Sequence, residues 1–531
     1  MFIYYNSSIR SIIIQCRNDK HIEIINLSKL KKIILKNKKK IAFLLPYYEG
    51  RNHSEFLGVG YLSQVLLTKG YDTLIFDEDA ICYLMEKKNA ENTFDSSRQF
   101  IFKKLSDYNP DVICVTINTA NYTNSLSLLR FIRKRFVGIK IIVGGPHITS
   151  SWATFKRYHK NLFDVAIIGE GEQTLLDVCN RLFKKKSLNV TNGAILSASN
   201  TNNLIANQLI NKLDDLPFPD REGFYKIFSN KEYPIIEKNY QDVFYSFLPG
   251  FRDKKYARIV GSRGCAFACD FCSPSILWKN NHTGIPVRRI RNPKKVVDEI
   301  EFLYQKKYRA FYFDDPTFPF KSEPDFYKTM ISEFKKRNIH IKWSAPTRSD
   351  ELSKEILQEL YDSGFTYTYF GLETDKKEKL INLGKCFDIE HSLNAIKWCD
   401  EIGIHCDVSY QVGVPGDNLD SIIKSIQWLE KHGLQKKSFF SIAAIWPETP
   451  LAIRYGLTSD DFEPETDKKK FEAHGLYFFE PGNPQIERYY SNCSGNFHFI
   501  DEATAIQIKY YLMDAGFIKR FDNKKIISAK D

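Results

Sequence analysis

The chain has 531 residues, of which 43% are hydrophobic and 14% aromatic, so it can build two or three buried cores, which argues against intrinsic disorder. Its net charge of +12 suggests nucleic acid as one candidate partner. However, part of that charge lies in KLKKIILKNKKK (29–40), a stretch that is typical of a solvated helix or linker. Eleven scattered cysteines and no recognisable secretory leader indicate a reducing, cytoplasmic setting, and no apolar run reaches the roughly 20 residues of a membrane-spanning helix.

After an N-terminal extension (1–39), residues 40–212 alternate short apolar strands with helical stretches. Continuous apolar strands between helices are typical of a parallel sheet that is covered on both faces. We therefore predict an α/β domain of the flavodoxin-like, doubly wound type, which binds ligands at the carboxyl ends of its strands. The strands are expected at 40–46, 72–77, 111–117, 140–145 and 164–172.

Glycines and a threonine stand at the expected strand ends. Gly144, Gly145, Gly169 and Gly171 would let the backbone approach a large flat or phosphate-bearing ligand, and Thr116 ends the third strand. Tight strand-to-helix turns explain the same glycines without any ligand.

A proline-containing linker (213–255) separates this domain from a second α/β region at 256–470, in which six strands are each followed by a helix or a long loop. This pattern predicts a partial β/α barrel with its chemistry at the strand carboxyl ends. The C-terminal extension (471–531) is expected to form a small cap or a helix pair.

Three cysteines, Cys265, Cys269 and Cys272, follow the first barrel strand in a C-x3-C-x2-C pattern. A closed zinc site needs four ligands, so zinc would require a remote fourth residue. A four-iron cluster on three thiolates keeps one iron free for a substrate or cofactor, and the position of the loop favours this interpretation.

With Phe271 before the last cysteine, this loop resembles that of the radical S-adenosylmethionine (SAM) enzymes. The resemblance implies a [4Fe-4S] cluster whose open iron holds SAM and cleaves it reductively to a 5′-deoxyadenosyl radical. Segments further along the barrel resemble the SAM-facing motifs of the family. They are YFDDPTF with Asp314, WSAPTRSD (343–350), GLET with Glu373, the later Lys385, and QVGVPGD with Gly413 and Gly416.

The N-terminal domain resembles the cobalamin-binding domain that precedes this barrel in one subgroup, through GVGYLSQVLLTKGY, IIVGGPH, DVAIIGEGE and LDDLPFPDR. The D-x-H-x-x-G motif that supplies a cobalt-binding histidine elsewhere is absent, so cobalamin is expected without a protein histidine on cobalt. Arg51 and His53 could approach its lower face, although a surface role explains both residues better.

The resemblance implies a radical SAM methyltransferase that acts on an unactivated carbon or phosphorus of a small molecule and takes electrons from a donor such as flavodoxin or ferredoxin. A non-methylating rearrangement or cyclisation enzyme and an iron–sulfur nucleic-acid-modifying protein stay open as alternatives. Catalytic residues, substrate and oligomeric state are not indicated.

Two further groups need interpretation. Asp314 and Asp315 are adjacent on a strand and face opposite ways, so at most one should reach the active site. Cys386, Cys399 and Cys406 lack the spacing of a compact cluster loop and are expected to be ordinary thiols.

Overall fold

A computed structural model describes most of the chain, namely residues 38–47, 55–188, 191–198, 209–242, 248–279, 283–443 and 445–463, with short segments within 2–26 and 476–511. Near the N-terminus, β1 (Phe2–Asn6), β2 (Ser11–Gln15) and β3 (Ile22–Asn26) pair as an antiparallel sheet. Most of the basic stretch at 29–40, together with Arg51 and His53, lies outside the described residues.

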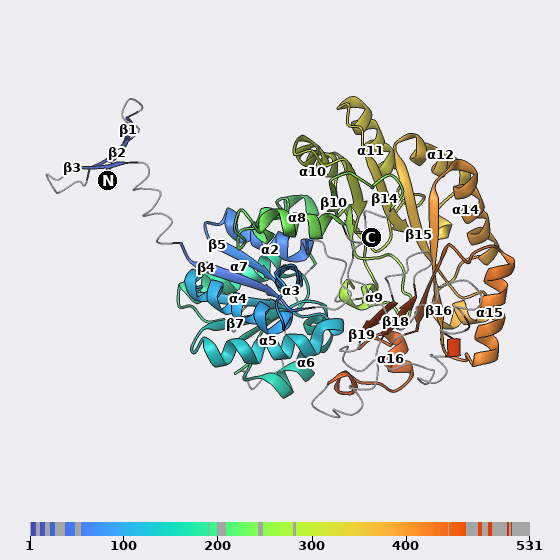
Figure 1. The fold of residues 1–531 in the computed structure, drawn as a ribbon, viewed down its shortest axis with the longest axis horizontal. Coiled ribbons are helices and arrows are strands. Elements are labelled where there is room, and N and C mark those ends of the chain that lie inside the picture. The colour runs from blue at the N-terminus through green and yellow to red at the C-terminus, as the bar shows by residue number, and fades with distance from the viewer. Residues whose placement is uncertain are drawn as a thin grey trace.

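The N-terminal domain is built on a six-stranded sheet in the order β5-β4-β6-β7-β8-β9 (Figure 1). Strands β4 to β8 are parallel in the flavodoxin-like order, and β9 pairs antiparallel at the edge. The predicted doubly wound domain is confirmed. The strands are β4 (Lys40–Leu45), β5 (Asp72–Asp77), β6 (Val112–Thr116), β7 (Lys140–Gly144), β8 (Val165–Ile167) and β9 (Ala194–Leu196).

Apolar strand residues explain why this sheet is covered on both sides, since the side chains of β4, β6 and β7 are nearly all buried. The covering helices pack in pairs, α2 on α7 and α3 on α4. The helices are α2 (Leu57–Thr68), α3 (Glu78–Lys87), α4 (Thr93–Tyr108), α5 (Tyr122–Arg135), α6 (Pro146–His159) and α7 (Gly171–Phe183).

The region between the domains, which was expected to be a linker, contains a helix, α8 (Tyr233–Asp242). Tyr240 of α8 is buried in the core of the N-terminal domain, and its hydroxyl donates to Asp77 Oδ2 at 2.8 Å. This helix therefore packs as part of the N-terminal domain.

The second domain is an open sheet of six parallel strands in chain order, which confirms the predicted partial β/α barrel (Figure 1). The strands are β10 (Tyr256–Ile259), β13 (Ala310–Phe313), β14 (Lys342–Thr347), β15 (Phe365–Glu373), β16 (His405–Val412) and β17 (Ser438–Ile442). The helices between them are α10 (Pro293–Gln305), α11 (Pro324–Lys336), α12 (Lys354–Asp362), α13 (Lys377–Asn382), α14 (Ile389–Ile402) and α15 (Leu419–Lys431).

Beyond β17 the sheet continues in an antiparallel hairpin of β18 (Leu476–Phe479) and β19 (Glu487–Tyr490). The sequence suggested a small cap or helix pair here, whereas these residues lengthen the barrel sheet at its edge. None of the helices among the described residues has both the length and the apolar character needed to cross a membrane.

Candidate active site

The three cysteines lie in a loop that begins where the barrel meets the N-terminal domain. After β10, β11 (Ser262–Arg263) pairs with β12 (Arg289–Ile290) in an antiparallel hairpin, and the cysteines lie between these two strands. Gly264, directly after β11, turns the chain with a φ of 82°. A Cβ at Gly264 would lie 2.0 Å from the carbonyl oxygen of Val287, so this turn requires glycine. Backbone bonds also hold the middle of the loop, from the Asp270 amide to the Leu383 oxygen at 2.9 Å and from the Leu451 amide to the Asp270 oxygen at 3.0 Å.

Cys265, Cys269 and Cys272 are half-buried and form no disulfide. Burial, followed by the neighbouring thiols of Cys269 and Cys265, raises the pKa of Cys272 to about 12, so the three thiols influence one another. Within the part of the chain that the structure describes, no three His, Cys, Asp or Glu side chains are placed to hold a metal ion.

The carboxylate of Glu373, at the mouth of the barrel, accepts three hydrogen bonds. Glu373 ends β15 at a register shift and has a left-handed φ of 62°, a strained conformation for a non-glycine residue. Its Oε1 accepts from Lys385 Nζ at 2.6 Å, and its Oε2 accepts from Gln411 Nε2 at 2.8 Å and from Ser409 Oγ at 3.3 Å. The strain and these donors fix the carboxylate in one orientation.

The glycine of the GLET motif makes room for this arrangement. A Cβ on Gly371 would lie 1.8 Å from Glu373 Oε1 and 2.3 Å from Lys385 Nζ. The structure thus brings together Glu373 and Lys385, which the sequence placed in the SAM site, although they are twelve residues apart.

The two adjacent aspartates were expected on a strand but follow the end of β13 at Phe313, and their environments differ. Asp314 lines a cleft between the domains and pairs with Arg258. Asp315 is buried, and its carboxyl oxygens accept from the Gly261 amide at 2.8 Å and the Ser262 hydroxyl at 2.6 Å. Burial raises the pKa of Asp315 to about 7. Asp315 is therefore a structural anchor for the strand end that leads to the cysteines.

Arg348 was not predicted as a site residue, although it lies within the WSAPTRSD segment. Its guanidinium lies 3.9 Å from the ring centre of Phe267 in the cysteine loop and makes two hydrogen bonds to Asp350, at 2.8 and 2.9 Å. Burial lowers the pKa of Arg348, but Asp350 and the thiols of Cys269 and Cys265 outweigh that effect and raise it. An arginine directly after a barrel strand was the sequence signal that could have identified it.

Phe271 and the turn after β16 form the neighbouring wall. Phe271 is partly buried and packs against two apolar groups, one with Val414 and Leu383 and one with Leu451. Gly413 and Gly416 both have positive φ, 72° and 88°, so this turn is shaped by glycine.

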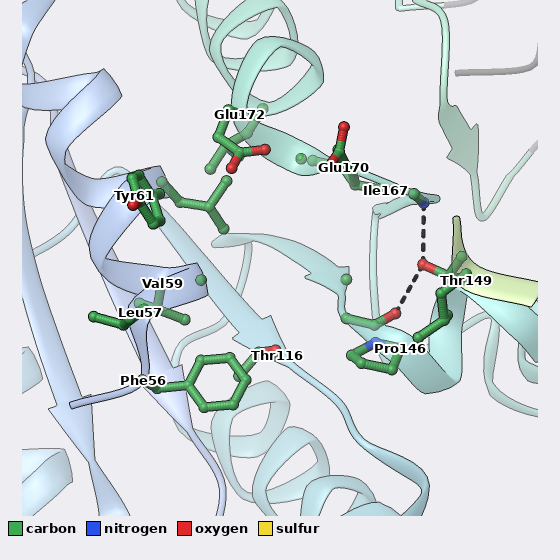
Figure 2. A pocket seen from close by; sticks show the side chains of 18 of the residues that line it. Phe56, Leu57, Val59, Tyr61, Thr116, Pro146, Thr149, Ile167, Glu170 and Glu172 are labelled. Carbon is green, nitrogen blue, oxygen red and sulfur yellow. Dashed lines mark hydrogen bonds between the residues drawn. The ribbon is translucent and has the colours of Figure 1, made fainter. Parts of the chain in front are cut away.

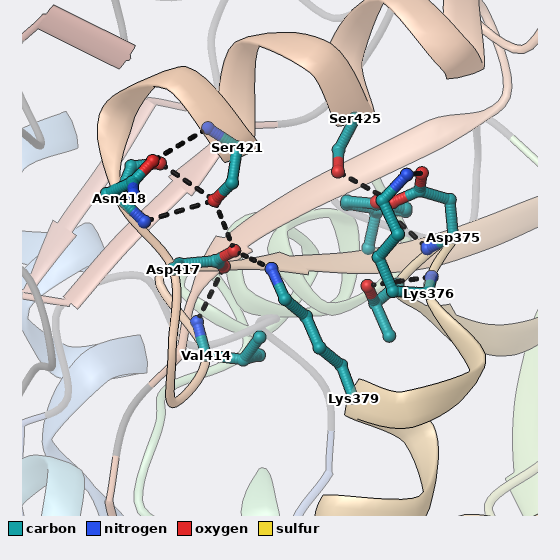
Figure 3. A network of polar contacts seen from close by, with 10 residues as sticks. Asp375, Lys376, Lys379, Val414, Asp417, Asn418, Ser421 and Ser425 are labelled. Atoms are coloured by element: carbon teal, nitrogen blue, oxygen red, sulfur yellow. Dashed lines mark hydrogen bonds and ion pairs between the residues drawn. The ribbon is translucent and has the colours of Figure 1, made fainter.

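A polar network holds that turn in place (Figure 3). Asp417 accepts from Lys379 of α13, from the Ser421 hydroxyl at 2.9 Å and from the Val414 amide at 3.0 Å. Asp375, just after β15, accepts from Ser425 at 2.6 Å. The ends of β15 and β16 are thereby tied to α13 and α15.

A cleft of about 350 Å³ opens at the carboxyl ends of β4, β6 and β7 (Figure 2). Four predicted glycines and Thr116 line it, together with apolar residues of α2 and of the strands. From the barrel side it is lined by Val260, Ser262, Arg263, Leu277, Trp278, Asp314 and Pro316. The described lining contains no histidine.

Backbone geometry forms the floor of this cleft. Gly145 has a φ of 105°, and a Cβ there would lie 2.7 Å from the Ile117 oxygen. Thr149 links the two glycine loops, because its hydroxyl donates to the Gly145 oxygen and accepts from the Gly169 amide, each at 3.0 Å (Figure 2). Gly144 differs, since a Cβ there would meet only the Ile167 oxygen at an ordinary 3.6 Å and is free to project into the cleft.

The remaining described cysteines have varied surroundings: Cys114 lines the cleft, and the carbonyl oxygen of Cys386 accepts from Arg348 at 3.2 Å. Cys399 and Cys406 are buried in the barrel core, and Cys386 is exposed.

Two family models match the chain. The Radical SAM superfamily model matches residues 259–429, and the B12 binding domain model matches residues 57–178. The chain is thus a radical SAM enzyme that carries a B12 binding domain.

Individual known proteins are also similar to this chain in sequence. The chain is 23% identical to an uncharacterized methyltransferase, PH0819, of Pyrococcus horikoshii over 66% of this chain and 70% of that one. It is 27% identical to the anaerobic magnesium-protoporphyrin IX monomethyl ester cyclase of Rubrivivax gelatinosus, over 72% of this chain and 64% of that enzyme, less than two thirds of its length.

Among solved structures, the chain is similar in fold to TsrM of Kitasatospora setae, a radical S-adenosylmethionine methyltransferase solved with cobalamin and a [4Fe-4S] cluster. The TM-score is 0.59 at 14% identity, over 78% of this chain and 77% of TsrM. This likeness describes the fold of both domains.

Proposed function

We propose that the protein is a cobalamin-dependent radical SAM methyltransferase that methylates an unactivated carbon or phosphorus atom of a small molecule. The observation that carries the proposal is the apolar cleft of the N-terminal domain, whose lining includes Leu277, Trp278 and Asp314 of the barrel. A ligand in this cleft would therefore border the barrel mouth, where the cysteine loop lies. The methyltransferase descriptions of PH0819 and TsrM support the same reaction class.

The residues present suit the two proposed metal cofactors. Cys265, Cys269 and Cys272 supply three sulfur donors, which suits a four-iron cluster with one open iron. The glycine-floored cleft has room for a flat macrocycle against the backbone, and its described lining offers no histidine to cobalt. When bound, the cluster supplies the electron that cleaves SAM, and cobalamin carries the methyl group.

In this proposal the protein's own residues bind and orient the cofactors. The fixed carboxylate of Glu373 is the candidate acceptor for ribose hydroxyls, and Lys385 and Arg348 are the cations nearest to a SAM carboxylate. Asp314 borders the methionine end, Phe271 packs on the turn that contains Gly413 and Gly416, and the cleft walls exclude water. An electron donor such as flavodoxin or ferredoxin completes the proposal.

A second candidate is radical cyclisation without methyl transfer, which the likeness to the magnesium-protoporphyrin ester cyclase favours. The two candidates require different products from the same cofactors. Methyl transfer yields S-adenosylhomocysteine together with 5′-deoxyadenosine, whereas cyclisation yields 5′-deoxyadenosine without S-adenosylhomocysteine.

The test uses the full-length protein, reconstituted anaerobically with iron, sulfide and cobalamin. We expect about one four-iron cluster per chain and bound cobalamin, both products of SAM on reduction, and loss of the cluster in Cys269→Ala. Cys399→Ala, which removes a buried thiol outside the loop, is the matched control and should keep its iron. Stoichiometric zinc without sulfide would overturn the cluster, and a protein that binds no cobalamin would overturn the methyl-transfer mechanism.

A further inference from the structure

Two acidic residues of the GEGE segment connect the cobalamin-binding loops to the cysteine loop. Glu170 occupies the N-cap position of α7, between Gly169 and Gly171 of the cleft. Its carboxylate accepts two hydrogen bonds from Arg289 of β12, at 2.7 and 3.0 Å. Arg263 of β11 lies 3.3 Å from the same carboxylate and 2.6 Å from Glu172. Both arginines thus bind the N-terminal domain from one hairpin of the barrel.

That hairpin leads directly into the cysteines, because Arg263 is two residues before Cys265. Arg263 also lines the cleft, where its guanidinium lies 5.0 Å from the ring centre of Tyr61. On the other side, the Gly169 amide before Glu170 bonds to Thr149, which bonds to Gly145. A continuous set of contacts therefore runs from the floor of the cleft to the first cysteine.

These ion pairs are buried, with side-chain exposures of 5% for Glu170, 7% for Arg289 and 13% for Arg263. Buried ion pairs add little net stability compared with apolar packing, because desolvation offsets their attraction. They do fix geometry, since a two-pronged arginine–carboxylate contact permits one relative orientation. Stability alone is therefore a poor explanation for their presence between the two proposed cofactor sites.

We propose that Glu170 is a positioning residue, which sets the separation and orientation of the cobalamin cleft relative to the cysteine loop through Arg289 and Arg263. This role rests on the proposed function, because it requires both cofactors. Without the carboxylate, each cofactor would still bind to its own residues, but the two would no longer be held at one fixed separation.

A second buried network between the domains provides a matched control. Arg221 of the linker joins Glu55, at 2.8 Å, to Glu299 of α10, at 3.2 Å. Glu55 also accepts from the Tyr225 hydroxyl at 3.2 Å, and neither Tyr225 nor Arg221 belongs to the β11–β12 hairpin. Glu55→Gln thus removes a buried interdomain carboxylate charge of the same kind without touching the route to the cysteines.

The experiment compares full-length wild type, Glu170→Gln and Glu55→Gln, each loaded with cluster and cobalamin. Pulsed electron paramagnetic resonance on the Co(II) and reduced-cluster state measures the separation of the two spins, and iron and cobalamin contents are assayed in parallel. We expect one narrow separation in wild type and in Glu55→Gln, and a broadened or longer separation in Glu170→Gln at unchanged cofactor contents.

If Glu170→Gln does not fold because Arg289 loses its carboxylate partner, the double variant Glu170→Gln/Arg289→Gln restores the charge balance without the ion pair and should show the same broadening. An unchanged separation in the folded Glu170 variants would overturn the positioning role while leaving the proposed function intact. A wild-type protein that holds only one of the two cofactors would overturn the proposed function and this role with it.

Discussion

The cleft of the N-terminal domain and the barrel mouth lie side by side, but their linings differ in chemical character. The cleft is lined mainly by backbone and apolar side chains, including the four predicted glycines, and its charged members are Glu170, Glu172, Arg263 and Asp314. At the barrel mouth, charged side chains are held in fixed orientations, such as Glu373 by Lys385, Gln411 and Ser409. Shape should therefore determine binding in the cleft, and charge should determine binding in the barrel.

The largest expected effect tests shape in the cleft. Gly144→Val places a branched side chain where the cavity opens and where the protein offers no clash, so the fold should persist while the ligand loses its space. We expect cobalamin affinity to fall by more than about 100-fold, which is about 3 kcal/mol, measured by titration of the apoprotein with cobalamin.

Gly145→Ala is the contrasting variant, because its left-handed φ and its contact with the Ile117 oxygen strain the backbone. It should lower the temperature of unfolding, whereas Gly144→Val should leave that temperature nearly unchanged. Normal cobalamin affinity in a folded Gly144→Val protein would show that the ligand does not occupy this cleft.

A smaller effect tests charge in the barrel. Glu373→Ala removes a carboxylate that can make charge-assisted hydrogen bonds, each worth about 1.5–3 kcal/mol. We expect the SAM concentration needed for half-maximal cleavage to rise by about tenfold to 100-fold, with iron content unchanged. Glu378→Ala, on the exposed face of α13, is the control. An unaltered SAM dependence would mean that another residue holds the cofactor.

The same contrast explains what the sequence could predict. Alternating apolar strands and helices predicted both sheets, and the glycines that now line the cleft stood out because each follows a strand. Asp314 lines the cleft and Asp315 is buried, but both lie beyond the end of β13, so alternation along a strand is not what separates them. The cofactor roles of these residues remain predictions.

Contacts between the domains could not be predicted in this way. Glu170 and Arg289 are 119 residues apart, and neither belongs to a local pattern that indicates its partner. Arg348 stacks on Phe267, which is distant in sequence, and Tyr240 of α8 bonds to Asp77 across 163 residues. Periodicity indicates which face of an element is buried, but not which charged groups meet across an interface.

The last expected effect concerns the stability of the fold and not ligand affinity, and it arises from Asp315, the buried counterpart of Asp314. Its folded-state pKa of about 7 lies above the usual value of 3.8, so the folded protein binds one more proton than the unfolded chain between these limits. The stability contribution of this group is therefore present below about pH 4 and is lost as the pH rises toward 7, with a slope of at most about 1.4 kcal/mol per pH unit.

Asp315→Asn imitates the neutral carboxyl, which bonds to Gly261 and Ser262, and should remove that slope. Urea unfolding of wild type and Asp315→Asn should give similar midpoints near pH 4 and a higher midpoint for the variant near pH 8, with exposed Asp420→Asn as the matched control. A difference between the two proteins that stays constant with pH would mean that Asp315 is ionised in the fold and anchors the cysteine loop as a charge.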